Sequence, residues 1–293
     1  MAVCFVVFNP AGTKRILMNY LYTKTHLESQ KIPTFTLELV YDGRTPEIPD
    51  AVHVTSKSYM FHKENLYRIL ETKIPKRYTK LAFLDCDVLF DDASWYYKTS
   101  KLLDTYDVVQ PFETAHWLDL TYSNIVLTRN TILYLKDKTW NFDHHPGFAW
   151  CMKRRWYNEV GFFDYAISGS GDTLSTAAWL DKTFPSKFQS LPRSIQSEYT
   201  KFRRLPHPEV TYLEGETIYH LYHGSRAKRK YADRHKMIDV PRDIHQLIKK
   251  NNNGVFEWRR TEEWNPMFFA YFNSRDDDDL SEVIPHVDET QTS

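Results

Sequence analysis

The sequence has 293 residues, 42% of them hydrophobic and 15% aromatic, enough to bury the core of one large α/β domain or two small ones. Lysine plus arginine and aspartate plus glutamate each number 38, so the formal net charge is zero, which argues against bulk nucleic-acid binding as the main activity. The three widely spaced cysteines indicate a reducing compartment and neither a disulfide framework nor a zinc site.

Strand-like and helix-like segments alternate at the start of the chain. The first ten residues lack the basic start and cleavage site of a signal peptide and read better as a strand that ends at Asn9-Pro10. Further strands are expected at 34–41, 51–56 and 80–84, and helices at 13–29 and 62–74. This alternation predicts a parallel, doubly wound sheet, in which ligands bind outside the carboxyl ends of strands.

The second half of the chain is less regular. Residues 96–112 indicate a helix and then a strand, and residues 144–180 a strand, a helix, a Gly/Ser-rich loop and another helix. A loop-rich stretch over 185–217 precedes a strand and a basic helix within 218–238. No repeat or linker divides the chain, so we expect one domain over 1–280, followed by an acidic, disordered tail over 281–293.

Asp85 and Asp87 lie in an otherwise apolar run, Leu81 to Phe90. Buried carboxylates need a partner or a metal, so the strand is expected to end near Leu84 with both aspartates at its carboxyl end. There they could converge on Mg²⁺ or Mn²⁺, which take oxygen ligands and keep positions for substrate phosphates. The alternative is a plain acidic turn that continues through Asp91 and Asp92.

Two further candidates stand in separate segments. Asp172, in the loop SGSGDT, could be a general base or simply the N-cap of the helix that follows. His223, in HLYHGSR, could be a metal ligand or, like His220, a satisfied core histidine. The basic cluster at 226–236 could be a solvated face, and the doublet His144-His145 is not on metal-ligand spacing.

Taken together, these residues describe one chemistry. A divalent ion held by Asp87 and His223, with Asp85 nearby, can bind a nucleotide diphosphate, and Arg226 and Arg229 can neutralise the leaving group. A carboxylate at Asp172 can accept the proton of an incoming hydroxyl. The sequence therefore predicts glycosyl transfer from a nucleotide sugar.

The chain also resembles a known family, the single-domain GT-A-fold glycosyltransferases of large DNA viruses, bacteriophages and some bacteria, which include the first domain of a chlorovirus capsid-glycan glycosyltransferase. The ordered motifs carry the resemblance over most of the chain. They are FNP, HKENLYRILETKIPKRYTKLAFLDCDVLFDDASW, YDVVQPF, PGFAWCMKR, GSGD, HLYHGSRAKRKYADRH and YFNSRDDDD.

The resemblance implies a GT-A fold: a Rossmann-like, mostly parallel sheet with helices on both faces and an adjoining acceptor-side region. It also implies roles for particular residues. Asp87, Asp85 and His223 would form the metal site, and Asp172 would be the general base of an inverting reaction. Donor-binding residues would be Phe8, Asn9, Pro10, Lys63, Asn65, Asp85, Arg226 and Arg229. Residues facing the sugar or the acceptor would be Gly147, Phe148, Ala149, Trp150 and Gly171.

The sequence departs from the family pattern around the proposed base. Inverting relatives often carry a Trp-Gly pair and a Glu-Asp pair around the base. In this chain Asp172 is the only carboxylate of the loop 168–173, which leaves the stereochemistry open.

We thus expect a cytoplasmic glycosyltransferase, in the host cytoplasm if viral, that uses Mn²⁺ or Mg²⁺ and a UDP-linked sugar. Its partners would be the nucleotide sugar and a glycan or other hydroxyl acceptor, with no membrane. Two alternatives remain: transfer to hydroxylated bases in DNA, or a metal-dependent nuclease or nucleic-acid-binding protein that uses the same acidic residues and basic segment. Loops at 112–120 and 185–217 would decide the sugar and the acceptor.

Overall fold

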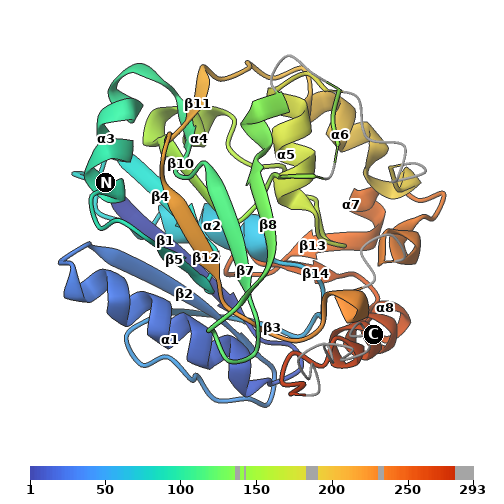
Figure 1. Ribbon diagram of the computed structural model, residues 1–293. Coiled ribbons are helices and arrows are strands. Elements are labelled where there is room, and N and C mark those ends of the chain that lie inside the picture. Colours follow the sequence, from blue (N-terminus) through green and yellow to red (C-terminus); the bar gives the residue numbers. More distant parts are fainter. Residues whose placement is uncertain (136–138, 142, 183–190, 230–233, 281–293) are drawn as a thin grey trace, which may run out of the picture.

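The computed structural model describes residues 1–135, 139–141, 143–182, 191–229 and 234–280, without the side chains of Arg226 and Ala227 (Figure 1). Its main sheet has the strand order β11-β6-β10-β4-β1-β2-β3. All neighbouring strands run parallel except β10, which is antiparallel to both β4 and β6. The strands are β1 (Ala2–Phe8), β2 (Thr34–Tyr41), β3 (Val52–Ser56), β4 (Lys80–Leu84), β6 (Val108–Gln110), β10 (Ala149–Lys153) and β11 (Val210–Tyr212). The predicted mostly parallel α/β sheet is therefore confirmed.

Helices cover both faces of this sheet because successive strand residues point to opposite sides. Phe5 of β1 shares a buried cluster with residues of α1 and α3, and Val6 shares the opposite cluster with residues of α2, α4 and α5. The α-helices are α1 (Lys14–Ser29), α2 (Lys63–Glu71), α3 (Trp95–Thr105), α4 (Arg154–Glu159), α5 (Gly171–Trp179), α6 (Gln196–Phe202), α7 (Ile244–Leu247) and α8 (Thr261–Ser274). Among the described residues, no helix combines the length and apolar character that crossing a membrane requires.

A second sheet, in the order β5-β12-β7-β8-β9, crosses the main sheet in the view of Figure 1. Its buried side chains, such as Phe90 and Ile218, belong to the same cluster as α1 and α3. The sequence analysis did not separate this sheet from the main one. Its strands are β5 (Val88–Phe90), β7 (Thr114–Leu118), β8 (Ile125–Thr131), β9 (His144–His145) and β12 (Thr217–His220).

The C-terminal part forms a third cluster, in which α8 packs against the hairpin of β13 (Ile248–Lys250) and β14 (Phe256–Trp258). Helix α5 contributes to this cluster through Leu174 and to the main-sheet cluster through Trp179, so it is held from two sides. The 3₁₀ helices are η1 (Ile132–Leu135), η2 (Arg193–Ile195), η3 (Arg226–Arg229) and η4 (Arg234–Ile238).

Three segments differ from their predictions. The loop predicted at 112–120 contains β7. The stretch predicted to be loop-rich contains η2, α6 and β11. The predicted basic helix is replaced, in the described residues, by η3 and η4. Arg229 and Arg234 both have largely buried side chains. In an α-helix two positions five residues apart would point about 140° away from each other, so one helix could not bury both against the same site.

The strand order reverses at β1 and β4. The chain runs from β1 through α1 to β2 and β3 on one side, and then through α2 to β4 on the other. Ligands of open α/β sheets bind at such a reversal, outside the carboxyl ends of the strands. Asn9-Pro10 follows β1 there, and Asp85-Cys86-Asp87 follows β4.

Candidate metal and nucleotide-sugar site

A cavity of about 860 Å³ opens at this strand reversal. Its wall gathers segments that are far apart in the sequence: the ends of β1 and β4, the start of α2, the loop before α5, the turn after β12 and the residues after α8. Lining residues include Asn9, Lys63, Asp85, Asp87, Asp172, His223 and Arg229. The structure thus brings most of the predicted site residues to one place.

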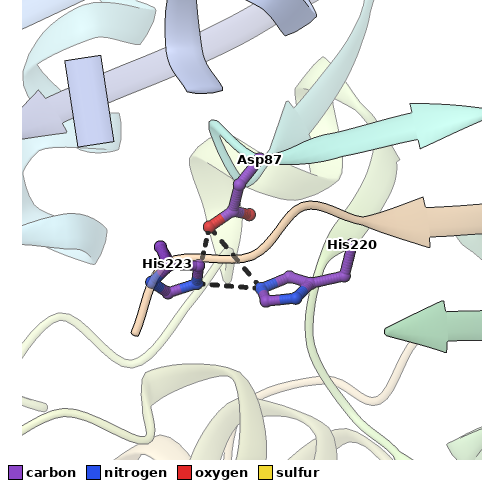
Figure 2. A group of neighbouring side chains, drawn as sticks. All are labelled: Asp87, His220 and His223. Atoms are coloured by element: carbon purple, nitrogen blue, oxygen red, sulfur yellow. Dashed lines mark hydrogen bonds and ion pairs between the residues drawn. The ribbon is translucent and has the colours of Figure 1, made fainter. Parts of the chain in front are cut away.

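Asp87, His220 and His223 form a compact group in this cavity (Figure 2). The Asp87 Oδ2 atom lies 2.9 Å from His223 Nε2 and 3.6 Å from His220 Nε2. The two Nε2 atoms lie 2.9 Å apart. Asp87 belongs to the turn between β4 and β5, His220 ends β12, and His223 follows three residues later. The pairing of β5 with β12 therefore brings the carboxylate to the two imidazoles.

The donor atoms of this group fit a divalent cation. Cis ligands about 2.1 Å from an octahedral ion lie about 3 Å apart. Two of the three spacings, both 2.9 Å, are close to this value, and the third is 3.6 Å. The Oδ1 atom of Asp87 is buried without a hydrogen-bond partner among the described residues, as expected for a carboxylate that needs a further cation. Burial lowers the pKa of His220 to about 4, so its imidazole is neutral, the form that binds metals.

Asp85 lies next to this group but has a different partner. Its carboxylate forms an ion pair with Lys63 at the start of α2. Although burial disfavours the ammonium ion, Asp85 and Asp172 raise the pKa of Lys63, which keeps its charge. Asp85, predicted as a metal ligand, is thus placed beside the ligand group, and His220, which was not predicted, is placed within it.

Asp172 lies in the first turn of α5, whose N-cap is Ser170. Its Oδ1 atom accepts the backbone N–H of Thr173 at 2.7 Å. A Cβ atom at Gly147 would overlap the other carboxylate oxygen, so that oxygen approaches the backbone of Gly147 directly. Asp172 is therefore not the N-cap that the alternative interpretation assumed, although it does satisfy one free amide of the helix.

The loop before α5 is held from the side of η4. His235 contacts Ser168 Oγ at 2.8 Å and Ser170 Oγ at 3.2 Å, and Arg234 donates to Ser170 Oγ at 2.7 Å. The guanidinium of Arg234 lies over the ring of Phe61, 4.7 Å from its centroid. These contacts fix the loop that presents Asp172 to the cavity.

Glu64 is a buried carboxyl group that sequence analysis missed. It lines the cavity between Lys63 and Asp172, and a Cβ atom at Gly171 would overlap its carboxylate. Burial raises the pKa of Glu64 to about 8, and the nearby Asp172 carboxylate adds to this effect. At neutral pH Glu64 is therefore mainly a neutral acid that can donate a hydrogen bond.

This raised pKa predicts a measurable pH dependence of stability. Because the folded protein keeps the Glu64 proton up to about pH 8 while the unfolded chain loses it near pH 4.5, stability falls between these values. The largest slope from one group is about 1.4 kcal/mol per pH unit. Glu64→Gln mimics the neutral acid. We expect its free energy of unfolding, measured with urea, to increase relative to that of the wild type as the pH is raised from 5 to 9. A difference between the two proteins that stays constant with pH would contradict this.

Most of the remaining residues that were predicted to bind the donor line the cavity. Phe8, Asn9 and Pro10 line the cavity, as does Arg229. Asn65 does not: it donates to Gly254 O at 3.1 Å and accepts from Phe256 N at 3.0 Å, which ties α2 to β14. The side chain of Arg226 lies outside what the structure describes.

The predicted sugar-side residues lie close to Asp172. Phe148 lines the main cavity, and Ala149 and Trp150 line a small second cavity together with Asp172. Trp150 is buried, and its indole N–H donates to Pro146 O at 2.8 Å. Gly147 and Gly171 allow the close approach of the two carboxyl groups described above.

The acidic segment Asp276–Asp279 follows α8 and has partners at every position. Lys228 pairs with Asp276 at 3.0 Å and with Asp279 at 2.5 Å. The Asp278 carboxylate accepts hydrogen bonds from the backbone N–H groups of Lys14 and Arg15, the first two residues of α1. Asp277 is buried and pairs with Arg229 and Arg275. The sequence alone suggests no role for this segment beyond its place in the resemblance.

No protein-family model matches the chain, and no curated protein sequence matches it. Among solved structures it resembles the catalytic domain of Drosophila β1,4-galactosyltransferase 7 in complex with xylobiose, with 11% identity over 92% of this chain and 98% of that one and a TM-score of 0.39. A glycosyltransferase involved in glycosylation of the major capsid of PBCV-1 has 11% identity over 81% and 98%, with a TM-score of 0.32. The galactosyltransferase LgtC, in complex with donor and acceptor sugar analogs, has 10% identity over 98% of both chains, with a TM-score of 0.32.

Proposed function

We propose that this protein is a GT-A-type glycosyltransferase that moves a sugar from a nucleotide-diphosphate donor to an acceptor hydroxyl. The observation that carries the proposal is one cavity, at the strand reversal, that contains both a group of side chains suited to hold a cation and a separate carboxylate. Asp87, His220 and His223 form the first, and Asp172 is the second. An inverting glycosyl transfer can use both, because negative charge leaves with the diphosphate while a proton leaves the acceptor.

The donor side of the cavity suits a nucleoside diphosphate. Asn9 and Pro10, after β1, offer a surface for the nucleoside, as expected at a strand reversal. A divalent cation bound by Asp87, His220 and His223 would supply positive charge to the two phosphates. Because two of the three ligands are imidazoles, Mn²⁺ suits the group better than Mg²⁺, which prefers oxygen ligands. Lys63, Arg229 and Arg275 add cationic side chains to the same wall.

The acceptor side is built around Asp172. Its Oδ1 atom is engaged by the amide of Thr173, so the other oxygen, which lies against Gly147, is the one that can take a proton. A hydroxyl that attacks the sugar carbon loses its proton to this oxygen as the bond to the diphosphate breaks. Attack on the face opposite the leaving group inverts the anomeric configuration, and we propose this course for the protein.

A donor screen in the presence of Mn²⁺ tests the function. Titration calorimetry with UDP-, GDP-, ADP- and CMP-linked sugars is expected to show metal-dependent binding of one nucleotide class, with UDP first among the candidates. Slow hydrolysis of the bound donor should follow in the absence of an acceptor, and chelation with EDTA should abolish both. Failure of every nucleotide sugar to bind, together with cleavage of DNA or RNA, would instead identify a metal-dependent nuclease.

A further inference from the structure

Glu64 is a buried carboxyl group whose place in the cavity is explained neither by the cation group nor by the general base. We propose that Glu64 binds a hydroxyl group of the sugar that is transferred, and so helps to decide which sugar the protein accepts. This inference rests on the proposed function, because it concerns the donor bound in the same cavity. Glu64 is the second residue of α2, is 5% exposed, and lines the cavity together with Lys63 and Asp172.

The protein itself does not satisfy the Glu64 side chain. Among the residues that the structure describes, its carboxyl group forms no salt bridge and no hydrogen bond with another residue. The other buried carboxylate of the same helix, Glu71, differs in this respect, because it accepts a hydrogen bond from Arg154. A buried polar group that lacks a partner costs stability, so a structural role does not account for Glu64. A ligand that enters the cavity can supply the missing hydrogen bonds.

The position of Glu64 matches the place that the sugar must take. In the proposed reaction the sugar lies between the diphosphate, near the cation group, and the carboxylate of Asp172. The Glu64 carboxyl group lies against the backbone of Gly171, the residue before Asp172, and a side chain at Gly171 would overlap it. At the other end, the preceding residue Lys63 pairs with Asp85, beside the cation group. Glu64 therefore borders the space between the two reacting ends.

A neutral carboxyl group suits a sugar hydroxyl. Burial raises the pKa of Glu64 to about 8, so the group keeps its proton at neutral pH. It can then donate one hydrogen bond and accept others, which matches a hydroxyl group that also does both. It adds no negative charge that would repel the phosphates of the donor. The transferred sugar is the expected partner because Glu64 follows Lys63 at the donor end, whereas the acceptor hydroxyl must reach the carboxylate oxygen that lies against Gly147.

Donors that lack one hydroxyl group test this contact in a double-mutant cycle. The probes are UDP-glucose and UDP-galactose, or the same hexoses on the nucleotide that the donor screen selects, and analogues in which one sugar hydroxyl at a time is replaced by hydrogen. Titration calorimetry with Mn²⁺ measures their affinities. One analogue should bind the wild type about 3- to 10-fold more weakly than its parent, the usual effect of one hydrogen bond. In Glu64→Met, of similar length but without the carboxyl group, this one penalty should vanish while those of the other analogues remain.

Glu64→Gln is the matched variant, because its amide also donates and accepts, and it should keep the penalty that Glu64→Met loses. Thermal unfolding of each variant checks that the fold is kept, and Glu64→Ala replaces Glu64→Met if the latter does not fold. A wild type that binds every analogue as well as its parent, an unchanged set of penalties in Glu64→Met, or the loss of all penalties at once would overturn the role of Glu64 while leaving donor binding intact. A wild type that binds no nucleotide sugar would overturn the proposed function and, with it, this inference.

Discussion

Asp87→Ala is expected to abolish Mn²⁺-dependent binding of the donor and, with it, sugar transfer. Asp87 supplies the one carboxylate of the cation group, and its removal leaves two imidazoles, which carry no negative charge to offset that of the ion. Since loss of an outer partner of a metal ligand already costs about 10- to 100-fold, loss of the ligand itself should cost at least about 100-fold in affinity.

The matched control for this variant is Asp91→Ala. Asp91 is an exposed carboxylate that follows β5, four residues further on, and it belongs to the acidic run that the alternative interpretation invoked. Titration of both variants with Mn²⁺ and then with the donor should show a loss for Asp87→Ala only. Intact metal-dependent binding in Asp87→Ala would reject the assignment of the cation site.

Asp172→Asn is expected to slow sugar transfer without weakening the binding of the donor or of Mn²⁺. The asparagine keeps an oxygen for the amide of Thr173, so the first turn of α5 should persist and donor and Mn²⁺ affinities should stay near the wild type. It cannot take a proton, and loss of a general base typically slows a reaction about 10²- to 10⁴-fold. Single-turnover transfer rates measured at saturating donor and Mn²⁺ report this step directly. Asp181→Asn, at an exposed position two residues beyond the C-terminal end of α5, is the control.

A transfer rate of Asp172→Asn within a few-fold of the wild type would remove Asp172 as the base. It would also reopen a retaining mechanism, which needs no such base, and the anomeric configuration of the product would then decide between the two courses.

Local patterns predicted the part of the fold on which the site is built. The apolar run that ends at Leu84 and the aspartates that follow it identified β4 and its carboxyl end, because strand length and the cost of buried charge are both readable in a short window. The pairing of β5 with β12 is not readable in this way. It places His220 beside Asp87, so the sequence alone suggested two residues of this group, Asp87 and His223, and missed the third.

Helix α2 shows a second limit. Lys63, Glu64 and Asn65 are consecutive and each polar, and successive residues of a helix point about 100° apart. They therefore cannot all face one cavity. Lys63 and Glu64 line it, while Asn65 turns to β14, a strand that sequence analysis had not placed. The direction of each side chain depends on the packing of α2 between the main sheet and the C-terminal part.

The span between Asp87 and Asp277 has a consequence for biosynthesis. His223 contacts both Asp87, in the turn after β4, and Asp277, near the end of the described chain. At about 5–20 residues per second, roughly 10–40 s separate the synthesis of these two aspartates. During that interval the nascent chain already carries the carboxylate of the cation group, without the residues that complete it. A chain truncated before Asp277 would therefore contain every strand of the main sheet and all three residues of the cation group, but not the carboxylate that pairs with Arg229 and Arg275.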